Sequence, residues 1–94
     1  MNKNELLEKM KERNRLSKSE NQLAVDTFIN IIYEALQNGE KVSLKGFGQF
    51  VTKERKSRSI RIPTSEKQVR VPAKEIPAFE PGEEFKSKVE RIIE

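Results

Sequence analysis

The chain contains neither cysteine nor histidine. Without cysteine there is no disulfide framework, no thiolate metal ligand and no thiol nucleophile. Without histidine the chain lacks the commonest general base and the commonest metal ligand in proteins. These absences argue against an enzyme, and we expect a protein without metal or cofactor.

Long apolar stretches are also missing. No run of apolar residues is long enough to span a bilayer, and the N-terminus lacks the apolar core of a signal peptide. We therefore expect a soluble, cytoplasmic protein with no membrane partner. The 94 residues, of which 34% are hydrophobic and 36% charged, suffice for one domain with a thin core. Dimerisation is one way for so short a chain to bury more surface.

Positive charge, by contrast, is concentrated in one segment. Residues 53–70 carry seven lysines and arginines against two glutamates, a net charge of +5, whereas the 19 basic and 15 acidic residues of the whole chain give +4. Four of the seven are arginines, which bind phosphate in bidentate geometry. A solvated loop is the alternative, but interleaved β-branched and small residues favour an extended strand. The concentration predicts a polyanionic partner.

Two helices are predicted in the N-terminal part. The first spans residues 3–14, with Asn2 or Asn4 as its cap. A Ser17–Glu20 capping box begins a second, long helix that runs to about residue 38. This helix is apolar around most of its circumference. We therefore expect it to be covered both by its own chain and by a second copy.

A β-hairpin is predicted after Gly39, which ends the long helix. Residues 41–45 and 49–52 alternate as strands, and the Gly46-Phe47-Gly48 turn joins them. Glycines on both sides of Phe47 permit a tight reversal while the ring points inward. We therefore expect an aromatic anchor at this turn.

The second of these strands continues into the basic segment. The residues from 69 to 79 are predicted to return beside it, so the basic segment forms one long two-stranded ribbon with its tip near 63–67. Pro72 and Pro77 have no backbone N–H to donate to a neighbouring strand. They therefore confine the returning strand to an edge or to irregular pairing.

A short helix is predicted at the C-terminus, from about residue 83 to 93. Its first turn begins with acidic residues, which suit a helix N-terminus. Phe85, Val89 and Ile92 recur at helical spacing, so we expect this helix to pack by that face.

Several of these segments together resemble the bacterial histone-like HU / integration host factor family. They are the opening MNKNELLEKM, the helix end NGEKV, the turn GFGQF, the arginines 55, 58 and 61 followed by Pro63, and the stretch VPAKEIPAFEPG. The resemblance covers essentially the whole chain. It implies that the chain forms an intertwined homodimer or heterodimer on double-stranded DNA.

The expected fold class is α+β. Two N-terminal helices and a short C-terminal helix form the dimer body, and a three-stranded antiparallel sheet extends into a long β-ribbon arm. One domain spans residues 1–94. Residues 1–40 form its helical dimerisation part, 41–81 its sheet with the arm at about 53–74, and 82–94 its C-terminal helix.

The resemblance also implies the roles of individual residues. The arm arginines contact the DNA backbone and groove, Pro63 wedges between base pairs, and Lys3 and Lys86 meet flanking phosphates. The full set of expected DNA-binding residues is Lys3, Gly46, Gly48, Lys53, Arg55, Lys56, Arg58, Arg61, Ile62, Pro63, Lys67, Arg70, Lys74 and Lys86.

The arm tip departs from the family pattern. The family usually has Arg-Asn-Pro followed by Gln-Thr-Gly, whereas here Ile62 replaces the Asn and Glu66 replaces the Gly. Loss of that glycine puts the usual tip turn in doubt. Ile62 either extends the apolar wedge or braces the arm.

The expected function is architectural. The resemblance implies that the protein binds and bends DNA and compacts the nucleoid. Backbone contacts carry no sequence information and minor-groove readout is degenerate, so we expect little sequence preference and a bias for nicked, gapped or already bent duplexes. The alternatives are a site-specific bender like integration host factor, an RNA-binding protein, a protein-interaction module with a basic arm, and an enzyme using Asp26 or Glu34. Competition by duplex RNA would favour the RNA-binding hypothesis, and binding to an acidic protein would favour the protein-interaction hypothesis.

Overall fold

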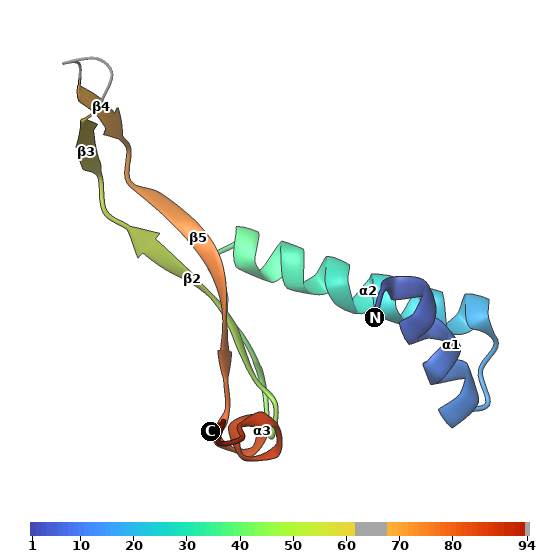
Figure 1. Cartoon of the computed structure of the whole chain (residues 1–94). Helices are drawn as coiled ribbons and strands as arrows, with labels where there is room; N and C mark the ends of the chain where they lie inside the picture. The colour runs from blue at the N-terminus through green and yellow to red at the C-terminus, as the bar shows by residue number, and fades with distance from the viewer. Residues whose placement is uncertain (62–67, 94) are drawn as a thin grey trace. The chain divides into compact units, whose positions relative to one another are not determined.

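The structure is a computed structural model that describes residues 1–61 and 68–93 (Figure 1). Its contacts divide the chain into two compact units, Met1–Glu34 and Ala35–Glu94. The division of the chain into parts at 1–40, 41–81 and 82–94 stays a prediction.

The first unit consists of two helices, α1 (Lys3–Arg13) and α2 (Lys18–Gln37), of which α2 continues beyond it. Asn2 caps α1, because its side chain accepts a hydrogen bond from the Glu5 backbone N–H at 2.9 Å. At the start of α2 the predicted capping box is confirmed. The Ser17 hydroxyl accepts from the Glu20 N–H at 3.2 Å, and the Glu20 carboxylate accepts from the Ser17 N–H at 3.0 Å. The bond from the Ser17 N–H to the carboxylate is the main cause that lowers the pKa of the Glu20 carboxyl below its ordinary value.

A part-buried pair of asparagine amides joins the two helices across the turn between them. Asn21 on α2 is fully buried. Its side-chain oxygen accepts from the Asn14 amide at 2.7 Å, and its own amide donates to the Asn14 oxygen at 3.2 Å. The Asn21 amide also lies 3.4 Å from the Leu16 carbonyl oxygen. Because both amides are satisfied by one another, this pair fixes the short connection from α1 to α2.

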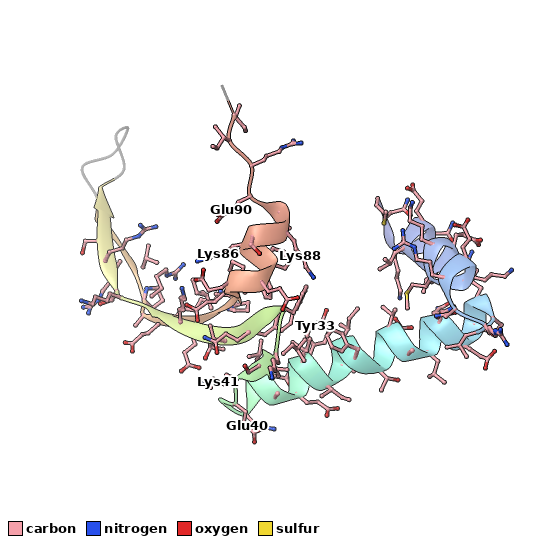
Figure 2. The ribbon with its side chains drawn as sticks, turned by 90° about the horizontal axis from the view of Figure 1, so that it is seen from below. Tyr33, Glu40, Lys41, Lys86, Lys88 and Glu90 are labelled. Atoms are coloured by element: carbon pink, nitrogen blue, oxygen red, sulfur yellow. The ribbon has the colours of Figure 1, made fainter. Side chains whose placement is uncertain are left out.

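The apolar surface of α2 is only partly covered within one copy. Among the described residues, just two large apolar side chains are buried, Leu7 at 3% and Ile32 at 8% exposure. Four others on α2 remain 45–70% exposed, namely Leu23, Phe28, Ile31 and Tyr33 (Figure 2 labels Tyr33). The chain's own coverage of α2, which the sequence predicted, is therefore incomplete.

The second unit begins at the end of α2. Gly39 adopts a left-handed conformation, with φ of 76°. Its N–H donates to the Leu36 carbonyl at 3.1 Å and the Glu40 N–H donates to the Ala35 carbonyl at 2.9 Å, which is the Schellman pattern. The predicted helix end at Gly39 is confirmed.

Three strands then form an antiparallel sheet in the order β1-β2-β5. The strands are β1 (Val42–Leu44), β2 (Gly48–Arg55) and β5 (Lys74–Pro81). A second antiparallel pair, β3 (Arg58–Arg61) with β4 (Gln68–Val71), continues beyond β2 and β5 (Figure 1). Pro77 lies in β5, which is an edge strand of the described sheet, as expected.

The predicted two-stranded ribbon is present as two ladders with a break between them, in agreement with the irregular pairing expected at Pro72. Residues 56–57 separate β2 from β3, and Pro72 and Ala73 separate β4 from β5. Proline has no N–H to donate to a ladder and restricts the backbone of the residue before it. β4 accordingly ends at Val71, directly before Pro72. Strand pairing resumes only on the other side of the break, where Arg55 lies opposite Lys74.

Four phenylalanines anchor the sheet. The rings of Phe47, Phe50, Phe79 and Phe85 form four close pairs, with centroids 5.0–5.5 Å apart. Two of the pairs are tilted and two are edge-on, and edge-on contacts are a favourable geometry for aromatic pairs. The predicted inward ring at the glycine turn is confirmed by the contacts of Phe47 with Phe79 and Phe85, although Phe47 keeps 40% of its surface exposed.

The C-terminal helix is shorter than predicted. It spans Glu83–Val89 as α3, and Ile92 and Ile93 lie beyond it. Phe85 packs into the aromatic cluster, but Val89 is 60% and Ile92 92% exposed. The prediction of one packed face through these three residues is therefore wrong after the first turn. Within the described residues, no helix combines the length and apolarity needed to cross a membrane.

Replacing Asn21 by alanine should lower the free energy of unfolding by about 1–3 kcal/mol, because the Asn14 amide loses its partner in a part-buried site. Urea denaturation at fixed protein concentration measures this loss. Gln22→Ala, an exposed neighbour on the same helix, is the control and should unfold like the unsubstituted protein. Equal stability of the Asn21 and Gln22 variants would contradict the role of the amide pair.

Candidate nucleic-acid interface

The base of the arm places three expected DNA-binding residues on one face of the sheet. Lys53 and Arg55 lie on β2, and Lys74 is directly opposite Arg55 on β5. Side chains alternate between the two faces of a strand, and directly opposed residues share a face. The β-ladder therefore brings these three cations together, although Lys74 is 19 residues from Arg55 in the sequence.

Arg55 is held in place by the opposite strand. Its Nη2 donates to the Pro72 carbonyl oxygen at 3.3 Å, and the side chain is half-buried. Its Nε is buried and has no hydrogen-bond partner among the described residues. The sequence identified Pro72 only as a break in the ladder and missed this contact, since it depends on which residues the register brings together.

Lys53 has an exposed ion-pair partner. Its Nζ lies 3.4 Å from Glu80, and the two side chains are 56% and 43% exposed. Glu80 also accepts from the Gln49 amide at 2.9 Å. Exposed ion pairs contribute roughly 0–1 kcal/mol, so a phosphate can replace Glu80 as the partner of Lys53 at little cost.

The outer arm carries further exposed cations. Lys56 lies in the break between β2 and β3, Arg58 is opposite Val71, and Arg70 is opposite Ser59. All three side chains are exposed. The Arg61 backbone pairs with Gln68. Ile62, Pro63 and Lys67 lie outside the described residues, so the expected wedge and arm tip stay predictions.

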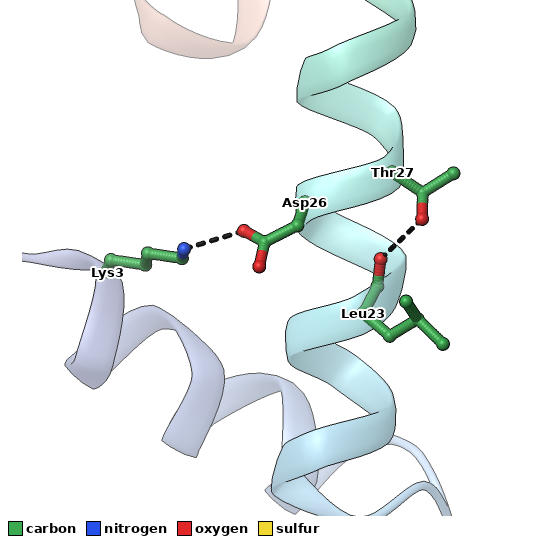
Figure 3. Close-up of polar contacts among 4 residues, drawn as sticks. All are labelled: Lys3, Leu23, Asp26 and Thr27. Carbon is green, nitrogen blue, oxygen red and sulfur yellow. Dashed lines mark hydrogen bonds and ion pairs between the residues drawn. The ribbon is translucent and has the colours of Figure 1, made fainter.

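The two expected body lysines each have a carboxylate beside them. In the first unit, Lys3 Nζ lies 2.6 Å from Asp26 on α2 (Figure 3). In the second unit, Lys86 lies on α3 (Figure 2). Its Nζ is 3.9 Å from a carboxylate oxygen of Glu83. Lys3 and Lys86 keep 52% and 44% of their side chains exposed, so both can reach a ligand. Asp26, one of the two carboxylates of the enzyme alternative, forms this ion pair with Lys3.

The turn glycines serve packing. A Cβ on Gly48 would lie 2.5 Å from the Glu80 carbonyl oxygen and 2.8 Å from the Phe79 ring. A Cβ on Gly46 would lie 2.8 Å from a carboxylate oxygen of the flexible Glu84 side chain, and the backbone there is left-handed with φ of 82°. Contacts within the chain thus explain why glycine is needed at both positions. Their expected approach to DNA stays a prediction.

Among the described residues there is no group of three or more acidic, histidine or cysteine side chains that could hold a metal ion. What the arm offers is a row of lysine and arginine donors on an extended ladder, which suits the phosphates of a nucleic-acid backbone.

Comparison with known proteins gives consistent matches along the chain. The family model described as "Bacterial DNA-binding protein" matches residues 1–90. The DNA-binding protein HU of Clostridium pasteurianum is 44% identical over 91 residues, which are 97% of this chain and 100% of that protein. The DNA-binding protein HU 1 of Bacillus subtilis is 42% identical over 89 residues, 95% of this chain and 97% of that protein.

Solved structures match as well. An Anabaena HU–DNA cocrystal structure is similar with a TM-score of 0.87 and 37% identity, covering 95% of this chain and 97% of that one. HU from Thermotoga maritima is similar with a TM-score of 0.68 and 31% identity, covering 96% of this chain and 100% of that one.

Gly48→Ala should destabilise the protein by about 1–3 kcal/mol more than Gly39→Ala. Both residues have positive φ, but only at Gly48 would the new Cβ meet backbone and ring atoms, whereas Gly39 has nothing within 4 Å. Urea denaturation of the two variants at one protein concentration makes the comparison. If Gly48→Ala proved no more costly than Gly39→Ala, the packing role of Gly48 would be wrong.

Proposed function

Because the chain belongs to the family of bacterial DNA-binding proteins, we propose that it is a histone-like architectural protein that binds and bends double-stranded DNA with little sequence specificity. It acts in the cytoplasm, on the nucleoid, and it is not an enzyme. The observation that carries the proposal is the placement of the cations. They lie along a two-stranded ribbon rather than around a pocket.

The binding mechanism follows from this placement. Lysine and arginine on an extended ladder meet successive phosphates, which fixes the position of the protein without reading the bases. Each phosphate neutralised releases counterions, so affinity falls steeply with salt. Lys3 and Lys86 exchange exposed carboxylate partners for flanking phosphates at little cost, because such surface pairs are weak.

The bending step involves the arm tip. Minor-groove benders, among which HU proteins are counted, insert apolar side chains between base pairs and kink the duplex. By resemblance, Pro63 is that wedge, with Ile62 beside it. Bending a duplex smoothly costs about 1–6 kcal/mol, so DNA that is already nicked or gapped binds more tightly.

A second copy completes the protein. Four large apolar side chains on α2 are 45–70% exposed in one copy (Leu23, Phe28, Ile31 and Tyr33), and burial of apolar surface is worth roughly 25 cal/mol per Å². A homodimer buries this surface and supplies two arms for one duplex. A heterodimer with a related chain would serve equally well.

Salt titration of binding to random-sequence duplex DNA tests the proposal. We expect log K to fall linearly with log salt, at about 0.9 per phosphate neutralised. A duplex with a central nick should bind about tenfold more tightly, and energy transfer between its labelled ends should rise on binding because the ends approach. Binding that is independent of salt, or duplex RNA that competes as well as DNA, would refute the proposal.

Single arm variants sharpen this titration. Arg58→Gln should lower the slope by about 1.8 per dimer, one phosphate for each arm. Lys11→Gln removes a cation from α1 that is also exposed and should leave the slope unchanged.

The dimer has its own test. Ile31→Asp places a charge on the exposed apolar surface of α2, and we expect sedimentation velocity to show loss of the dimer. Asn30→Asp adds the same charge one residue away, at an exposed position that is already polar, and should leave the dimer intact. An unsubstituted protein that sediments as a single copy would contradict the dimer.

A further inference from the structure

The last two rungs between β2 and β5 each pair like charges. Glu54 is opposite Glu75, and Arg55 is opposite Lys74. Directly opposed residues of an antiparallel pair have Cβ atoms about 4.5–5.5 Å apart, and like charges at that spacing weaken the pairing. Both rungs lie at the base of the arm, immediately before the break at residues 56–57. The ladder is thus least favourable at the point where the arm leaves the sheet.

The two rungs face opposite sides of the ribbon. On one side, Gln49 and Lys53 both contact Glu80. On the other side, Phe50 contacts Phe79, with ring centroids 5.0 Å apart. Alternation along β2 places Arg55 with Lys53 on the first side and Glu54 with Phe50 on the second. At its base the ribbon therefore has a cationic face, with Lys53, Arg55 and Lys74, and an acidic face, with Glu54 and Glu75.

The side chains of Arg55 and Lys74 are placed so that both can bind the same anion. The bond from Nη2 to the Pro72 carbonyl holds the Arg55 side chain in place while using one of its five N–H donors. Lys74 is exposed and has three donors. A phosphate between the two side chains accepts from both and replaces their mutual repulsion by two attractive contacts. The acidic rung offers phosphate only repulsion.

We propose that the base of the arm binds a duplex by one face only, with Arg55 and Lys74 sharing a single backbone phosphate on that face and Glu54 and Glu75 keeping the other face away from DNA. This inference rests on the proposed function and adds to it how the arm is oriented on the duplex. Arg55 and Lys74 act here as one site, not as two independent contacts.

Salt titration of the double variant Arg55→Gln, Lys74→Gln counts the phosphates. If the pair shares one phosphate in each arm, the slope of log K against log salt falls by about 1.8 per dimer, as for Arg58→Gln. A fall of about 3.6 means that each side chain has its own phosphate and overturns the shared site. An unchanged slope overturns it as well. Circular dichroism verifies that the double variant is folded.

Directed cleavage tests the orientation. Because the chain has no cysteine, an iron–EDTA reagent can be attached at one introduced cysteine, either Lys53→Cys or Glu54→Cys. These neighbours are both exposed and lie on opposite faces. We expect strand cleavage from residue 53 to exceed that from residue 54 by about tenfold. Equal or reversed cleavage by a variant that still binds DNA overturns this inference and leaves the proposed function standing. If the unsubstituted protein does not bind DNA, the proposed function itself is overturned.

Discussion

The pairing of β2 with β5 is the constraint on which the rest of the arm depends. It runs in register from Gly48 opposite Pro81 to Arg55 opposite Lys74. One end is anchored by the phenylalanine cluster around Phe79, and the other end carries the cations. A slip of one residue would exchange the two faces of a strand, moving the aromatic rings away from their partners and the acidic residues onto the cationic face. Anchoring and charge presentation are therefore set by the same register.

The local parts of this structure could be predicted from the sequence. The Ser17–Glu20 capping box, the helix end at Gly39 and the glycine turn around Phe47 each depend on a few neighbouring residues, and each is present. Their hydrogen bonds and backbone angles involve positions at most a few residues apart, so composition and spacing are enough to identify them.

The parts that could not be predicted depend on contacts between distant residues. The role of the buried Asn21 could not be predicted from α2 alone, because its partner Asn14 lies seven residues away, beyond the start of that helix. The bond from Arg55 to Pro72 and the two like-charge rungs require the register of β2 on β5, which no single segment contains. The length of the C-terminal helix was overestimated, because Val89 and Ile92 have helical spacing in the sequence although the helix ends at Val89.

The edge of β5 has a consequence for the behaviour of the protein at high concentration. An exposed strand edge offers unpaired N–H and C=O groups on which another chain can add a strand, and this is how sheet proteins aggregate. Pro77 removes one of these donors, and the charged residues Lys74, Glu75 and Glu80 surround it on the same strand. The proline and the charges on the open edge therefore disfavour the joining of neighbouring arms into continuous sheets when the protein is concentrated.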